Sequence, residues 1–173
     1  MRRMVDPDAA DARAVLDPAT GTVTATVDLA CPPERVYRML ITAETERWWG
    51  SPGTYAMREW IAELRPGGTW RVVVCFADGR QLPASGSFVE FDPPERVVQT
   101  RRYEFDHPTL GRRPTLVTYR LTPRGGGARL TVVHEGFRGF DDAAAEHALG
   151  WERVLGWLEP YARRVHEEEG RWQ

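Results

Sequence analysis

The stretch from about Asp141 to Glu169 constrains the fold more than any other part of this chain. Its apolar residues recur at alternating spacings of three and four, which is typical of an amphipathic helix. Two tryptophans and a tyrosine widen the apolar face, and a face this wide and aromatic predicts a partner that surrounds the helix. The stripe and its flanks are formed by Ala148, Trp151, Leu155, Leu158, Ala162 and Val165, with Val154, Trp157 and Tyr161.

Three residues inside this predicted helix are unusual for a helix interior. Pro160 lacks a backbone donor, so we expect a kink there. Gly150 and Gly156 have no side chain, so they permit close backbone approach or leave room beside the helix. The space between the helix and its partner is therefore a candidate cavity.

The rest of the chain supplies that partner. Residues 22–30 alternate Thr with Val or Ala, which predicts a strand, and two short helices follow before Gly50. From about 58 to 136, turn signals divide the chain into six strand-like runs. These elements predict an α+β fold in which a curved antiparallel sheet of about seven strands wraps around the long C-terminal helix.

The chain has the length of one domain, with 173 residues, of which 42% are hydrophobic. Residues 1–20 are rich in Ala, Asp and Pro and show little periodicity, although part of them could form a loose helical turn or two. We therefore expect a flexible N-terminal tail over 1–20 and a single domain over 21–173.

Composition excludes several classes of function. The 23 basic and 25 acidic residues give a net charge of −2, which argues against nucleic-acid binding. All basic residues are Arg, so a Schiff-base lysine and a phosphate-loop lysine are excluded. Neither the four His nor Cys31 and Cys75 have metal-site spacing, so we expect no metal and no cofactor. No apolar run suits a signal peptide or membrane span, so we expect a cytoplasmic protein without membrane insertion.

Five motifs resemble one known family, in its order, over about residues 22–164. The sequence is similar to the START-like superfamily (SRPBCC, helix-grip), and within it to the AHSA-type branch, named after activators of the heat-shock chaperone ATPase. The resemblance implies a helix-grip fold around an apolar pocket, but superfamily members include carriers, cyclases, hydrolases and co-chaperone domains. The motifs are "VDLACPPERVYRMLITAETERWWG", "LRPGGTWRV", "GSFVEFDPPERVVQT", "TYRLTPRGGGARLTVVHEGF" and "GWERVLGWLEPYARR".

Alternation along the strands selects candidate pocket residues. The even positions of 70–76 and of 130–134 face inward, which directs His134 toward the interior. A lone His on an apolar face is more often a hydrogen-bonded structural residue than a ligand anchor. The pair Trp48 and Trp49 falls near the expected pocket mouth, where a structural and a functional role are both reasonable. The candidate ligand-binding residues are Trp60, Trp70, Phe76, Gln99, Arg101, Tyr103, Tyr119, His134, Trp151 and Leu155.

Arg101 departs from the family pattern, in which an aromatic residue is usual at this point. The odd residues from 97 to 105 carry more apolar side chains than the even ones, so they face inward and take Arg101 with them. A buried guanidinium requires a partner, either Glu90, Glu63 or an acidic group of the ligand. Alternatively, a bulge allows the side chain to reach solvent at the pocket rim.

These patterns favour binding of a small apolar or aromatic molecule, with or without an acidic group, and they assign no catalytic residue. One alternative is a cyclase- or hydrolase-like enzyme with His134 as acid or base. Another is a protein-interaction domain like the chaperone activators. A homodimer is compatible with the sequence.

Overall fold

The computed structural model describes residues 11–172, which form one sheet and three helices. The chain begins with two strands, continues with two short helices and six more strands, and ends with a long helix. The elements are β1 (Arg13–Asp17), β2 (Thr22–Leu29), α1 (Pro33–Ile41), α2 (Thr45–Trp48), β3 (Tyr55–Ala62), β4 (Thr69–Phe76), β5 (Gln81–Asp92), β6 (Arg96–Tyr103), β7 (Thr115–Arg124), β8 (Gly127–Glu135) and α3 (Asp141–Gly170).

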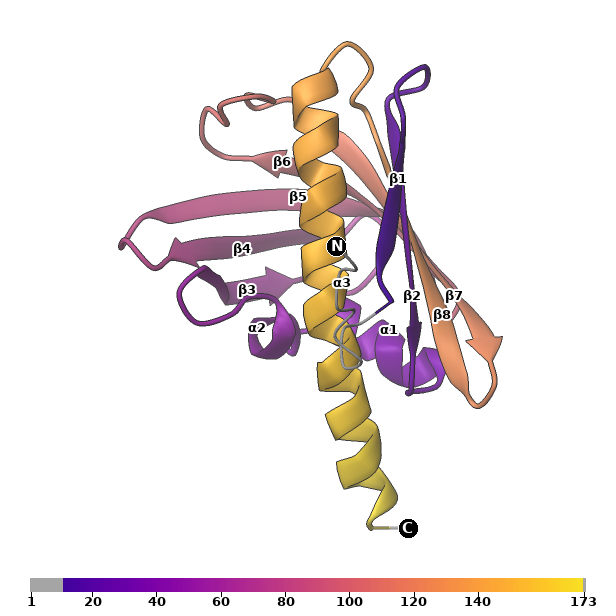
Figure 1. The fold of residues 1–173 in the computed structure, drawn as a ribbon. Helices are drawn as coiled ribbons and strands as arrows, with labels where there is room; N and C mark the ends of the chain where they lie inside the picture. The colour runs from indigo at the N-terminus through magenta and orange to yellow at the C-terminus, as the bar shows by residue number, and fades with distance from the viewer. Residues whose placement is uncertain (1–10, 173) are drawn as a thin grey trace, which may run out of the picture.

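The eight strands form a single antiparallel sheet in the order β1-β2-β8-β7-β6-β5-β4-β3. In Figure 1, α3 crosses one face of this curved sheet, with β3 to β6 on one side of it and β1, β2, β7 and β8 on the other. The α+β helix-grip arrangement predicted from the sequence is confirmed, with eight strands instead of about seven.

The strand missed by the sequence patterns is β1, which falls within the predicted flexible tail. Residues 13–17 pair with residues 22–26 of β2, and the backbone N–H of Ala14 donates to the Glu152 carboxylate of α3 at 3.0 Å. The prediction of flexibility for these residues is therefore wrong, because pairing and helix contacts order a segment whose own sequence signal is weak. Residues 1–10 of the predicted tail lie outside the described residues.

The curvature of the sheet has a local origin in its strands. The pairing of β3 with β4 shifts register between Arg58 and Ile61, and the pairing of β5 with β6 shifts between Phe88 and Glu90. Glu59, in the first of these irregularities, has a positive φ of 57°. Such bulges bend a strand and increase its twist, which lets the sheet close around a helix.

Helix α3 supplies the centre of the core. Trp151, Leu155 and Leu158 are buried against the sheet, as the helical periodicity predicts. The helix is continuous through Pro160, where the sequence predicted a kink. One edge of its apolar face packs against β1 and β2. The other edge faces strands β3 to β6 across a pocket.

Candidate functional site

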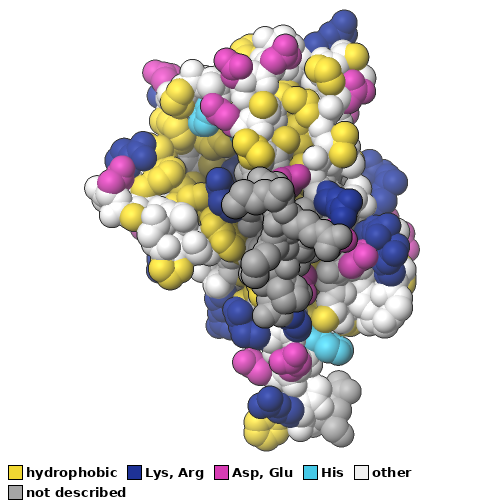
Figure 2. Space-filling model, viewed as in Figure 1, with side chains coloured by type: hydrophobic (Ala, Val, Ile, Leu, Met, Phe, Trp, Pro, Cys, Tyr) yellow, Lys and Arg dark blue, Asp and Glu magenta, His cyan; other side chains and the backbone are white. Residues whose placement is uncertain are grey.

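A pocket of about 490 Å³, here called the main pocket, lies between α3 and the inner face of strands β3 to β6. Tyr55, Met57, Val74 and Leu82 line its sheet side, and Figure 2 shows hydrophobic side chains gathered beside the upper half of α3. Leu149 of α3 lines the pocket and is 67% exposed, so the pocket opens to the surface. Because most of the lining residues are hydrophobic or aromatic, most of the pocket wall is apolar, as in small-molecule sites generally.

Three polar side chains cluster in this pocket around Tyr103, near the end of β6. The Tyr103 hydroxyl lies 2.9 Å from Nε2 of His147, and the His107 ring stacks on the Tyr103 ring at 4.5 Å. The guanidinium carbon of Arg101 lies 5.6 Å from the centre of the same ring. Strand β6, the loop that follows it and the first half of α3 together form this polar cluster.

Hydrogen bonding fixes the proton positions on His147. Its Nδ1 lies 2.7 Å from the carbonyl oxygen of Ala143, which can only accept, so Nδ1 carries the proton. Burial lowers the pKa of His147 to about 4, and the nearby Arg101 charge acts in the same direction. The ring is therefore neutral at pH 7, and its Nε2 accepts the hydrogen bond from the Tyr103 hydroxyl.

Arg101 faces inward, as strand alternation predicts. Neither carboxylate expected as its partner contacts it, because Glu90 pairs with Arg96 at 3.7 Å and Glu63 pairs with Arg65 at 2.8 Å. The guanidinium instead lies against the ring of Trp49, at 5.7 Å from its centre, as well as against Tyr103. Arg101 thus lines the pocket wall between two aromatic rings.

A second, much smaller void lies behind Arg101. Its volume is about 20 Å³, the room that one water molecule needs. Arg101 lines both this void and the main pocket, and Gln99 lines the void from the same strand. Arg101 Nε and Gln99 Oε1 are fully buried, and neither has a hydrogen-bond partner within the described residues. They are a donor and an acceptor beside the same void.

The ten candidate residues fall into three groups in the structure. Phe76, Arg101, Tyr103 and Trp151 line the main pocket. Trp60, Trp70, Gln99 and Tyr119 line the small void together with Arg101, with Trp60 stacked on Trp70 at 5.6 Å. His134 and Leu155 line neither, and both are fully buried in the core.

His134 has a structural environment. The Trp151 indole Nε1 donates to its Nδ1 at 3.0 Å, and Thr115 Oγ1 lies 2.7 Å from its Nε2. Because Nδ1 accepts, the neutral ring carries its proton on Nε2 and donates to Thr115, whose own hydroxyl donates to the Arg101 carbonyl oxygen. Burial lowers the pKa of His134 well below its ordinary value. Both ring nitrogens are hydrogen-bonded within the core, and the ring lines neither the main pocket nor the small void.

Several pocket residues were not among the sequence candidates. His147 precedes Trp151 by one helical turn, so the helical periodicity could have found it. Phe105 and His107 lie in the loop after β6, where no periodicity indicates the direction of a side chain. Of the tryptophan pair, Trp49 lines the pocket, whereas Trp48 donates from its Nε1 to the Met39 carbonyl in the core.

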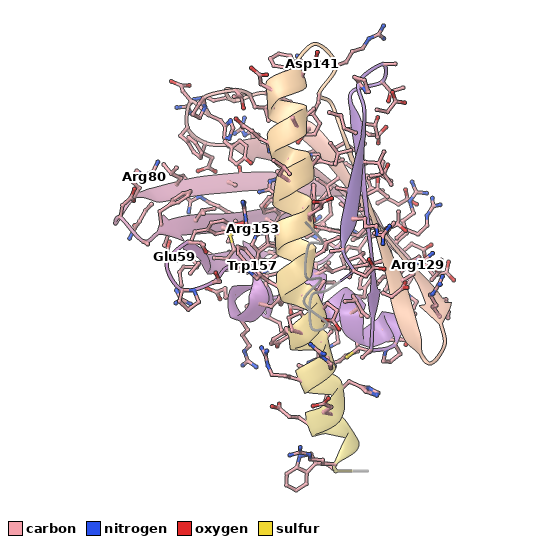
Figure 3. All side chains as sticks on the ribbon, viewed as in Figure 1. Glu59, Arg80, Arg129, Asp141, Arg153 and Trp157 are labelled. Carbon is pink, nitrogen blue, oxygen red and sulfur yellow. The ribbon has the colours of Figure 1, made fainter. Side chains whose placement is uncertain are left out.

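The pocket rim carries further charges. Arg80, from the turn between β4 and β5, and Arg153, from α3, both line the pocket and are labelled in Figure 3. Arg80 is paired with Asp78 at 2.8 Å, and the Arg153 guanidinium lies 5.8 Å from the rings of Tyr55 and Trp157. These rim arginines are exposed, in contrast to Arg101.

The sequence argued against a metal site and against a membrane-spanning helix. Within residues 11–172, no group of three or more His, Cys, Asp or Glu side chains is placed to hold a metal ion. None of the helices in the described part of the chain combines the length and the apolar character needed to cross a membrane.

Comparison with known proteins shows which solved structures share the fold of this chain and which family it belongs to. No curated protein matches its sequence significantly. Several solved structures have the same fold. A Chromobacterium violaceum protein matches at 29% identity and a TM-score of 0.70, and the match covers 82% of this chain and 96% of the other. A Rhodobacter sphaeroides protein matches at 23% identity and a TM-score of 0.74, and the match covers 89% of this chain and 99% of the other. The AHSA1 protein of Silicibacter pomeroyi matches at 22% identity and a TM-score of 0.67, covering 85% and 99%.

The family comparison is more specific than these structural similarities. The model of the family described as Activator of Hsp90 ATPase homolog 1-like protein matches residues 30–163, which is most of the chain and includes the pocket and its polar cluster. The chain therefore belongs to the Activator of Hsp90 ATPase homolog 1-like protein family.

Proposed function

We propose that this protein binds a small hydrophobic or aromatic molecule in the main pocket. The observation that carries the proposal is a pocket of about 490 Å³, open to the surface, with an apolar wall and one polar cluster. Ligand sites are typically about 300–1,000 Å³ in volume and combine an apolar lining with a few polar groups that fix orientation. Aromatic side chains suit an aromatic ligand, because ring pairs gain energy beyond the area that they bury.

Two features favour binding over the alternatives. His134, which the enzyme alternative requires, has both ring nitrogens engaged in the core. Gly150 lies in the pocket wall, and a Cβ built on it meets only Arg153 Nη2, at 3.9 Å. Gly150 therefore leaves open space in the helix wall of the pocket, which is room for a ligand.

The test is a fluorescence titration with N-phenyl-1-naphthylamine, a neutral aromatic probe. We expect saturable 1:1 binding to the wild-type protein. Gly150→Leu fills the pocket from its helix wall and should weaken binding at least about tenfold, a loss of about 1.4 kcal/mol. Gly156→Leu is the matched control, because Gly156 lies in the same helix outside the pocket lining and has no heavy atom within 4 Å of an added Cβ.

Two results would contradict the proposal. One is the lack of saturable binding to the wild type. The other is equal binding by Gly150→Leu and the wild type, with both variants folded by circular dichroism.

A further inference from the structure

Arg101 has an arrangement that the core packing does not explain. It is a permanent cation on the inner face of β6, and within residues 11–172 no carboxylate lies within 4.0 Å of it. Removing a guanidinium from water without a partner is costly, so folded proteins pair such groups with anions or acceptors. The carboxylates expected from the sequence, Glu63 and Glu90, pair with other arginines.

The immediate neighbours of Arg101 compensate its charge only in part. The Trp49 and Tyr103 rings lie within cation–π range, at 5.7 Å and 5.6 Å. These contacts leave the N–H groups unpaired, and no described residue accepts a hydrogen bond from the side chain. Its Nε is fully buried beside the small void, whereas the two Nη groups retain accessible surface. Because Arg101 also lines the main pocket, that surface faces the space where a ligand would lie.

Two ring nitrogens of the cluster are already engaged. The Nε2 of His147 accepts from Tyr103, and the Nδ1 of His107 lies 3.3 Å from the backbone nitrogens of Thr109 and Leu110. Glu146, the acidic residue of the lining, is exposed and accepts from Thr109 Oγ1 at 2.8 Å. Arg101 is therefore the one cation of the inner wall whose donors are unused among the described residues.

We propose that the ligand carries a carboxylate and that both Nη groups of Arg101 bind it. This inference rests on the proposed function, because it specifies the chemistry of the molecule in the same pocket. The planar fork of a guanidinium matches the two oxygens of a carboxylate, and such bidentate pairs are among the strongest hydrogen-bonded contacts. Arg101 is one cation on the inner wall, so it balances the single negative charge of one carboxylate group on the ligand. The apolar body of the ligand then packs against the rings of Phe76 and Trp151.

The test compares two compounds that differ only at the charged group. Naphthalene-2-carboxylate and naphthalene-2-carboxamide have the same ring and nearly the same shape, and their affinities are measured by isothermal titration calorimetry at pH 7.5. We expect the wild-type protein to bind the carboxylate about 10- to 100-fold more tightly, the range for hydrogen bonds to a charged group. Arg101→Leu should bind both compounds with similar affinity.

Arg102→Leu is the matched control. It removes the same charge from the next residue of β6, whose side chain is exposed on the outer face, and it should keep the preference of the wild type. Thermal melting without ligand provides a second readout. Replacing a half-buried cation that has no ion-pair partner with an apolar residue leaves no charge uncompensated, so we expect Arg101→Leu to melt no lower than the wild type.

The outcomes separate this inference from the proposed function. Equal affinity of the wild type for both compounds, or a preference that survives in Arg101→Leu, would overturn the carboxylate inference and leave pocket binding intact. If neither compound nor N-phenyl-1-naphthylamine binds the wild type, the proposed function fails. If Arg101→Leu does not fold, Arg101→Gln replaces it, and the wild-type comparison of the two compounds remains decisive.

Discussion

The indole Nε1 of Trp151 donates a hydrogen bond of 3.0 Å to Nδ1 of His134, and this bond joins the middle of α3 to strand β8. Both residues are buried, with exposures of 4% and 0%. Trp151 also lines the main pocket with another part of its surface. One side chain therefore fixes the helix against the sheet and forms part of the candidate binding wall.

Trp151→Phe should destabilise the protein by about 1–3 kcal/mol, because it leaves the buried Nδ1 of His134 without its donor. Trp151→Ala should cost about 3–5 kcal/mol, because it also leaves a cavity at the contact of helix and sheet. Urea denaturation followed by circular dichroism measures both values. A loss below about 1 kcal/mol for Trp151→Ala would show that this contact does not support the fold.

The fold was largely predictable because each long element has its own periodicity. The spacing of apolar residues in α3 and the alternation along β4 and β6 depend only on which side of an element is buried. Strand β1 was not predictable in this way. It is short and has little sequence signal of its own. It is ordered by pairing with the neighbouring strand β2 and by the hydrogen bond from Ala14 to Glu152, a residue 138 positions away in the sequence.

The site was predictable only where a regular element carries it. Alternation placed Arg101 and Tyr103 on the inner face of β6, and the structure has both in the pocket lining. Alternation also placed His134 inside but could not distinguish a core position from a pocket position, because that depends on how far the sheet lies from α3. The loop carrying His107 follows no period, so its approach to Tyr103 could come only from the tertiary structure.

Gly86 of β5 should be intolerant of any side chain. A Cβ at this position would lie 1.8 Å from the carbonyl oxygen of Thr100 and 2.7 Å from Nε1 of Trp70, which itself donates to that carbonyl. Since backbone must move to admit it, Gly86→Ala should cost about 1–3 kcal/mol or more by urea denaturation. Gly156→Ala, in open space on α3, should instead be neutral or stabilise by up to about 1 kcal/mol. Equal stability of the two variants would contradict this reading of Gly86.

Glu44 joins the short helices to α3. Its carboxylate accepts from Arg35 at 2.7 Å and 2.8 Å and from the Tyr161 hydroxyl at 2.7 Å. Burial alone would raise the pKa of Glu44, but the hydrogen bonds from Arg35 and Tyr161 outweigh it, so the pKa is lowered. This stabilisation is therefore present above the pKa of the unfolded chain and is lost as the pH falls through the folded value.

Glu44→Gln should lower the free energy of unfolding at pH 7 by about 1.5–3 kcal/mol, the range for hydrogen bonds to charged groups. The difference from the wild type should shrink between pH 7 and pH 3, as the pH falls toward the lowered pKa of the wild-type carboxyl. Glu63→Gln, in the exposed pair with Arg65, should have no measurable effect at either pH. A Glu44→Gln difference that is constant between pH 7 and pH 3 would mean that its charge does not contribute.

His147 should make the protein less stable in mild acid. Burial lowers its pKa from about 6.5 in the unfolded chain to about 4 in the folded protein. Between these values the unfolded chain binds a proton that the folded protein does not, so the free energy of unfolding decreases as the pH falls from 6.5 toward 4. For this one residue the loss at pH 4.5, relative to pH 7.5, should be about 2–3 kcal/mol.

Urea denaturation of wild type and His147→Gln at pH 7.5 and pH 4.5 measures this contribution, because carboxylates and His134 titrate in both proteins and cancel in the comparison. We expect the acid-induced loss to be about 2–3 kcal/mol smaller in His147→Gln. The proton NMR signal of the His147 ring should titrate near pH 4 in the folded wild type. Titration near pH 6.5, with equal acid sensitivity of the two proteins, would mean that the His147 ring is solvated and that its hydrogen bond with Tyr103 does not persist in solution.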